Sequence, residues 1–225
     1  MNGGGGNPLT VFERTLRALV REELLRLSED AASPAAAATA GLALMTPPDG
    51  MGAYVLYDQD KAVSTLLDMS GETSRELAKA LTAAGAVVGM LYVDKTAQCW
   101  EARTVMSVAA QRGYGPLLYD VAMADGPLAP MRDSVSLSAE RVWRHYYERR
   151  PDVVHEPLRQ CRKHVSVRPW LNFKYTLTGS PPVGPLRARH EGTVEELSYD
   201  FSRADVEAAL RGAADKYFDS RYTEA

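Results

Sequence analysis

The segment VMSVAAQRGYGPLLY, residues 105–119, limits the possible folds more than any other part of the chain. It begins as a β-rich run, passes two glycines, and continues into an apolar helix that begins at Pro116. Proline is favoured in the first helical turn, where its missing amide is not needed. Gly113 and Gly115 let successive backbone amides turn inward, and the helix N-terminus adds partial positive charge. With Arg112 beside it, this turn is predicted to bind a phosphate group; a plain glycine turn without a ligand is the alternative.

The hydrophobic pattern around this segment is typical of a mixed α/β chain. Residues 86–94 and 100–108 are predicted to pair as a β-hairpin, and residues 62–69 fit a strand or a helical turn. Thr73 or Ser70 is expected to cap a helix that Gly85 ends. Further strands are predicted at residues 52–58, 134–137, 153–154, 164–167 and 171–177, and residues 30–50 are expected to be a connector that contains a short ordered piece at 42–45. Further helices are predicted at residues 8–28, 116–124, 139–150 and 202–219, the last capped by Asp200 or Ser202.

The order of these elements predicts one main α/β domain with a mixed, mostly antiparallel sheet flanked by helices. Residues 1–7 form a glycine-dominated tail that is expected to be flexible, and residues 8–40 an N-terminal helix and connector. The main domain is assigned to residues 41–178. Residues 179–225 are a C-terminal extension, in which a polar connector at 179–192 precedes the last helix.

The glycine turn resembles the signature of the GNAT acyltransferase superfamily, Gln/Arg-x-x-Gly-x-Gly/Ala, which follows the fourth strand of that fold. The matching frame is Ala110-Gln111-Arg112-Gly113-Tyr114-Gly115, with Ala110 in place of the polar residue. The resemblance implies a GNAT-like sheet and acetyl-CoA as a co-substrate. Its phosphates would bind Gln111, Arg112, Gly113, Tyr114 and Gly115.

A second resemblance lies at residues 140–149. The next helix of the family reads Asn-x-x-Ala-x-x-Leu-Tyr-Glu-Lys, and Tyr146-Tyr147-Glu148-Arg149 stands at its end, whereas Glu140 and Trp143 depart from the pattern. The family tyrosine protonates the departing thiolate, so Tyr147 is the first candidate for a general acid and Tyr146 the second. Packing in the core is the alternative role of both. The stretch DSVSLSAERVWRHYYERRPDV is also similar to segments of bacteriophage-encoded GNAT-like proteins.

The resemblance further implies that an amine attacks the thioester directly. The thioester would be bound where the fourth and fifth strands separate. An amide of Met106, Ser107 or Val108 would polarise the thioester carbonyl. The attacking amine must be neutral, so a base is needed. Glu101 is the first candidate and Asp120 the second, with an exposed structural role as the alternative for each.

Composition excludes several other classes. A net charge of −3 argues against broad nucleic-acid binding, although the basic residues 159–168 could contact a phosphate. The two cysteines and four histidines show no metal-ligand spacing, so no metal site is expected. The sequence contains no Gly-x-Ser-x-Gly motif, so a serine hydrolase is poorly supported. No apolar run is long enough for a membrane span, and a cytoplasmic location is expected, in the host cytoplasm if the protein is viral.

Three functional interpretations therefore stay open. The first is an acyl-CoA-dependent N-acyltransferase with an unidentified amine acceptor. The second is a catalytically inactive GNAT-like structural or interaction protein. The third is a phage enzyme that modifies nucleic acid.

Overall fold

The computed structural model describes residues 33–96, 99–131, 134–159, 165–179 and 183–223. All of them belong to the unit Ala32–Ala225. The tail at 1–7 and the helix predicted at 8–28 lie outside the described residues.

The described strands form one seven-stranded sheet in the order β1-β2-β3-β4-β5-β7-β6. Neighbouring strands are antiparallel except β4 and β5, which are parallel. The α/β prediction and the hairpin of β3 with β4 are thus confirmed. The strands are β1 (Leu42–Met45), β2 (Gly52–Asp58), β3 (Val87–Thr96), β4 (Cys99–Ala110), β5 (Leu128–Pro130), β6 (Val153–Pro157) and β7 (Phe173–Leu177).

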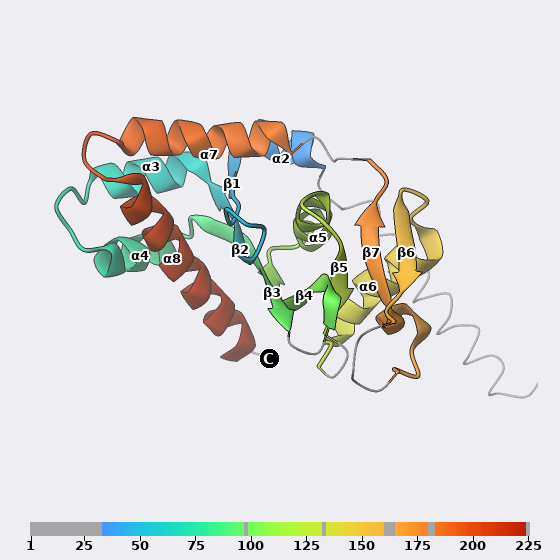
Figure 1. Cartoon of the computed structure of the whole chain (residues 1–225). Helices are drawn as coiled ribbons and strands as arrows, with labels where there is room; N and C mark the ends of the chain where they lie inside the picture. The colour runs from blue at the N-terminus through green and yellow to red at the C-terminus, as the bar shows by residue number, and fades with distance from the viewer. Residues whose placement is uncertain (1–32, 97–98, 132–133, 160–164, 180–182, 224–225) are drawn as a thin grey trace, which may run out of the picture. The chain divides into compact units, whose positions relative to one another are not determined.

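Helices cover both faces of this sheet (Figure 1). On one face α5, α6 and the start of α7 share a core with Leu91, Val93 and Val105. On the other face α3, α4 and α8 share a core with Val55 and Met90. The helices are α2 (Pro34–Thr39), α3 (Gln59–Leu67), α4 (Ser74–Ala83), α5 (Gly115–Ala124), α6 (Leu137–Arg149), α7 (Gly184–Leu197) and α8 (Arg203–Thr223), with a 3₁₀ turn at Pro169–Asn172.

Local capping signals explain where several helices begin. The Thr73 hydroxyl accepts from the Glu76 amide, and the Glu76 carboxylate accepts from the Thr73 amide, which makes a capping box for α4. Ser202 caps α8 by accepting from the Asp205 amide. Asp58 caps α3, and the ambiguous segment 62–69 is mainly helical, with Ala62, Val63 and Leu66 buried.

Four sequence predictions are wrong. Residues 134–137 are not a strand, because the Ser136 side chain caps α6, which begins at Leu137. Residues 165–167 form no strand, and the first residues of the segment 171–177 belong to the 3₁₀ turn. The connector predicted at 179–192 contains most of α7. The glycine and proline at the start of α7 are typical of a loop. Pro185 nevertheless lies in the first helical turn, where proline is tolerated.

Candidate functional site

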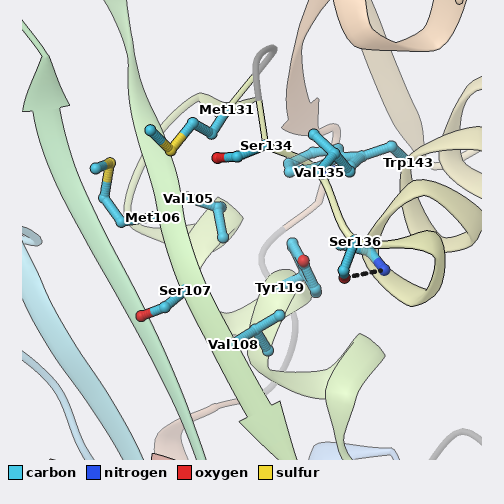
Figure 2. A pocket seen from close by; sticks show the side chains of 11 residues that line it. Val105, Met106, Ser107, Val108, Tyr119, Met131, Ser134, Val135, Ser136 and Trp143 are labelled. Carbon is cyan, nitrogen blue, oxygen red and sulfur yellow. Dashed lines mark hydrogen bonds between the residues drawn. The ribbon is translucent and has the colours of Figure 1, made fainter. Parts of the chain in front are cut away.

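The candidate site lies where β4 and β5 part. The two parallel strands pair over only three positions, ending at Val105 opposite Pro130. A pocket of about 310 Å³ begins there, with β4 as one wall (Figure 2). The lining residues are Val105, Met106, Ser107 and Val108 of β4, Tyr119 of α5, Met131, Ser134 and Val135 after β5, and Ser136, Ala139 and Trp143 at the start of α6.

A β-bulge marks the same point of β4. Tyr92 of β3 pairs with Ser107, whereas the next residue, Val93, pairs with Val105. Met106 is therefore the extra residue of β4. Bulges redirect side chains and are frequent beside active sites. Here the bulge changes the direction of the backbone just where β4 loses β5 as a neighbour.

The bulge also determines which amide faces the pocket. The Arg103 amide donates to the Pro127 carbonyl, on the β5 side, at 3.1 Å, and the Gln111 amide donates to the Val88 carbonyl, on the β3 side, at 2.8 Å. Backbone groups of a strand alternate between its two neighbours. The Gln111 amide points toward β3, so every second amide before it also points toward β3. The Val108 amide, three residues before Gln111, therefore points away from β3. Because Val108 lies beyond the last pair with β5, its amide faces the gap that the pocket occupies.

The glycine turn follows directly. Gly113 has a φ of +89°, a conformation that favours glycine, whereas Gly115 does not need one. A Cβ added at Gly115 would meet nothing within 4 Å. No side chain caps α5 at Tyr114, and within the described residues the Gly113 amide has no hydrogen-bond partner. The Tyr114 amide donates within the turn to the Gln111 carbonyl, whereas the Gly113 amide and the start of α5 offer backbone donors that suit an anion.

Arg112 and Gln111, the polar residues of the turn, are exposed. They lie beside the donors of Gly113 and can approach an anion from solvent. A guanidinium adds charge-assisted hydrogen bonds to a phosphate. The predicted β4 residues Met106, Ser107 and Val108 line the pocket, whereas the predicted turn residues 111–115 follow β4 in the chain and are not among its lining residues.

Two aromatic side chains form the inner wall of the pocket. Tyr119 and Trp143 are each 1% exposed, and their rings meet edge to face with centroids 5.1 Å apart. Figure 2 shows both near the space between β4 and α6. Neither residue was predicted from the sequence to line a site; Trp143 was noted only because it departs from the family pattern. Nothing local marks them, because they meet through the packing of α5 against α6.

The predicted acid Tyr146 does not line the pocket. Its buried hydroxyl donates to an Asp120 carboxylate oxygen at 2.8 Å and lies 3.2 Å from the Pro116 carbonyl. Burial, followed by the nearby Asp120 carboxylate, raises the pKa of Tyr146 well above its usual value. Arg150 also binds Asp120, at 3.2 Å. Burial nevertheless raises the pKa of Asp120, which is engaged between α5 and α6 rather than available as a base in the pocket.

Tyr147, the first candidate acid, is also absent from the lining. Its ring packs against His155 of β6 at 4.6 Å and Phe173 of β7 at 5.1 Å. Adjacent helical residues point in different directions, so Tyr146 and Tyr147 face different surroundings. Glu101 lies in β4, but its side chain is outside the described part of the structure. Of the predicted site residues, the pocket is thus lined by Met106, Ser107 and Val108, and both predicted tyrosines lie outside it.

Arg103 fixes α5 beneath the site. It is buried, and it donates to the Gly50 carbonyl at 2.6 Å, to the Tyr54 hydroxyl at 2.8 Å and to the Gly126 carbonyl at 2.6 Å. It also donates to the Ala122 carbonyl. A cation at a helix C-terminus satisfies carbonyls that lack partners and opposes the negative end of the helix dipole. The C-terminal end of α5 is therefore tied to β4 two residues before the pocket.

The basic segment 159–168 is described only at its ends. Arg168 pairs with Glu140 of α6 at 2.5 Å, and the guanidinium of Arg144 lies over the Trp170 ring at 5.2 Å. Arg168 and Arg144 are thus engaged with the protein itself. Binding of nucleic acid by the segment stays a prediction.

Comparison of the chain with family models, curated proteins and solved structures gave no match. Among the described residues, no three potential ligands gather into a metal-binding group. No helix in the described ranges is long and apolar enough to cross a membrane.

Proposed function

We propose that the protein is an acyl-CoA-dependent N-acyltransferase whose thioester binds in the gap between β4 and β5. The observation that carries this proposal is the parting of two parallel strands beside a glycine turn that opens a helix. The similarity to the GNAT signature assigns phosphate binding to the turn and pantetheine binding to the gap. β4 lines the gap, and the turn follows directly after the end of this strand.

The thioester carbonyl is assigned to the Val108 amide, whose direction follows from the alternation along β4 beyond the bulge. A preorganised backbone donor stabilises the oxyanion that forms as the amine attacks the carbonyl carbon. The pyrophosphate is assigned to the amides around Gly113, with Arg112 beside it. These roles need no side-chain nucleophile, since the amine attacks the thioester directly.

The pocket suggests a different alignment of α6 with the family pattern. Ser136, Ala139 and Trp143 line the pocket at spacings of three and four. A frame four residues earlier than the one first predicted places Ser136 and Ala139 at the Asn and Ala positions. Trp143 then occupies the tyrosine position and cannot protonate the departing thiolate. Tyr119, the tyrosine among the lining residues, is our candidate for that proton transfer.

A catalytically inactive CoA-binding protein is the second candidate function. Trp143 at the tyrosine position favours it, as does the engagement of the Tyr146 hydroxyl with Asp120. In both cases the proposed cofactor pocket is kept, but the chain lacks a tyrosine that could act as the general acid in the place where the family has one. The two candidates therefore share a binding site and differ in turnover.

Release of the CoA thiol from acetyl-CoA, measured with and without a panel of primary amines, separates the two candidates. The acyltransferase predicts amine-dependent thiol release that falls in Tyr119→Phe while acetyl-CoA affinity is kept. Binding without turnover for every amine would favour the inactive protein. Failure to bind acetyl-CoA at millimolar concentration would contradict both.

A further inference from the structure

The last β4–β5 pair, Val105 with Pro130, bounds the pocket at one end of its β4 wall, which is called the closed end below. The wall continues from there to Val108, which lies nearer to the glycine turn at Gly113. If the phosphates bind at the turn, as the proposed function requires, the pantetheine arm runs along β4 from Gly113 toward Val105. The acyl group then lies at the closed end. This step rests on the proposed function.

The side chains at that closed end are apolar except for Ser134. Val105 comes from β4, Met131 and Val135 come from the segment after β5, and Trp143 comes from α6 (Figure 2). None of the described lining residues carries a formal charge at neutral pH. Burial of a carboxylate among apolar groups without a paired cation is strongly unfavourable. The lining therefore suits an uncharged acyl group.

Trp143 is held more firmly than the other residues of the closed end. Its ring contacts Tyr119 at 5.1 Å, Tyr175 at 5.0 Å and Tyr146 at 6.2 Å between centroids. Methionine is flexible and can adapt to a ligand, as Met131 can. A tryptophan surrounded by three buried tyrosines cannot move aside without disrupting the core. The Trp143 ring thus limits how far a bound acyl chain can extend at the closed end.

We infer that Trp143 determines acyl specificity, restricting the site to short, uncharged acyl groups. The pocket volume of about 310 Å³ is at the lower end for ligand sites, and the pantetheine arm must share it. An acyl chain that extends beyond the closed end must displace Trp143 or leave the pocket. Either event weakens binding.

Calorimetric titration of the full chain with free CoA, acetyl-CoA, octanoyl-CoA and succinyl-CoA tests this inference. Apolar pockets discriminate about tenfold or more per misfitting methylene. Acetyl-CoA should therefore bind at least about tenfold more tightly than octanoyl-CoA and succinyl-CoA. Trp143→Ala should bring the affinities for octanoyl-CoA and acetyl-CoA together. Val135→Ala, at a half-buried position outside any helix, should shift the ratio in the same direction if Trp143→Ala does not fold.

The outcomes separate the two levels of the account. If neither CoA nor any thioester binds, the proposed function fails and the inference fails with it. If CoA and all thioesters bind with one affinity, the binding site stands and Trp143 sets no specificity. Octanoyl-CoA binding as tightly as acetyl-CoA to the natural chain would overturn the inference, as would a folded Trp143→Ala that keeps the original preference.

Discussion

Tyr146 of α6 donates a hydrogen bond of 2.8 Å to Asp120 of α5, and this bond joins the two helices that flank the pocket. Tyr146→Phe removes the donor and leaves a partly buried carboxylate with Arg150 alone. Loss of a hydrogen bond to a buried charge costs about 1–3 kcal/mol. Urea unfolding should show a decrease of that size.

Tyr147→Phe is the matched control, because the neighbouring tyrosine makes no hydrogen bond through its hydroxyl among the described residues. Its ring contacts with His155 and Phe173 remain in phenylalanine. Its free energy of unfolding should change by less than about 0.5 kcal/mol. Equal losses in the two variants would argue against a specific contribution from the Tyr146–Asp120 bond.

Gly113 and Gly115 are predicted to differ in their tolerance of alanine. Gly113→Ala forces a side chain into a φ of +89° and should lower stability by about 1 kcal/mol or more. Gly115→Ala places its Cβ in open space and should leave stability unchanged or slightly raised. Thermal unfolding of the two variants side by side measures the difference. Equal destabilisation would mean that the turn does not have the described conformation.

The direction of the Val108 amide can be tested with proline, which removes the amide hydrogen. Ala109→Pro should remove a donor from the β3–β4 ladder, whereas Val108→Pro loses side-chain packing but no ladder bond. We expect Ala109→Pro to be the more destabilising by at least about 1 kcal/mol in urea unfolding. A larger loss for Val108→Pro would show that the Val108 amide belongs to the ladder.

His190 should make stability depend on pH. Its Nδ1 lies 2.9 Å from the Tyr57 hydroxyl and its Nε2 lies 3.8 Å from Glu207, and burial lowers its pKa. A lowered histidine pKa contributes stability that is fully present above the unfolded value of about 6.5. That stability is lost as the pH falls toward the folded pKa. The slope for one group is at most about 1.4 kcal/mol per pH unit.

Urea unfolding between pH 5 and 7.5 measures this slope, and His190→Gln should reduce it. His145→Gln is the comparison, because burial lowers the pKa of His145 as well, although that side chain is only half-buried. We expect the smaller reduction there. An unchanged slope in His190→Gln would mean that His190 does not titrate differently in the folded and unfolded chains.

Local rules predicted much of the fold because the relevant residues are close in sequence. Thr73, one of two predicted caps, and the proline at position 116 place helix starts within one residue or two. Alternating and continuous apolar runs identified β2, β3 and β4. The mistakes occurred where two rules compete, as at Gly184 and Pro185, which suit a loop as well as the start of a helix.

The candidate site was only partly predictable for a related reason. Gly113 and Val108 belong to one continuous segment, and its pattern could be read directly. Tyr119 and Trp143 reach the pocket only because β4 parts from β5 and α6 packs on α5. The choice between Tyr146 and Tyr147 depends on how α6 is rotated against the sheet. No short stretch of sequence contains that information.

Calorimetric titration with acetyl-CoA tests most directly the claim that the gap between β4 and β5 binds acyl-CoA. Ala139→Phe fills the pocket from α6, and Ser138→Phe is the control, because Ser138 is exposed and does not line the pocket. Acetyl-CoA should bind the natural chain and Ser138→Phe with similar affinity, and at least about tenfold more weakly to Ala139→Phe. Absence of binding to the natural chain at millimolar acetyl-CoA, or unchanged affinity in a folded Ala139→Phe, would contradict the claim.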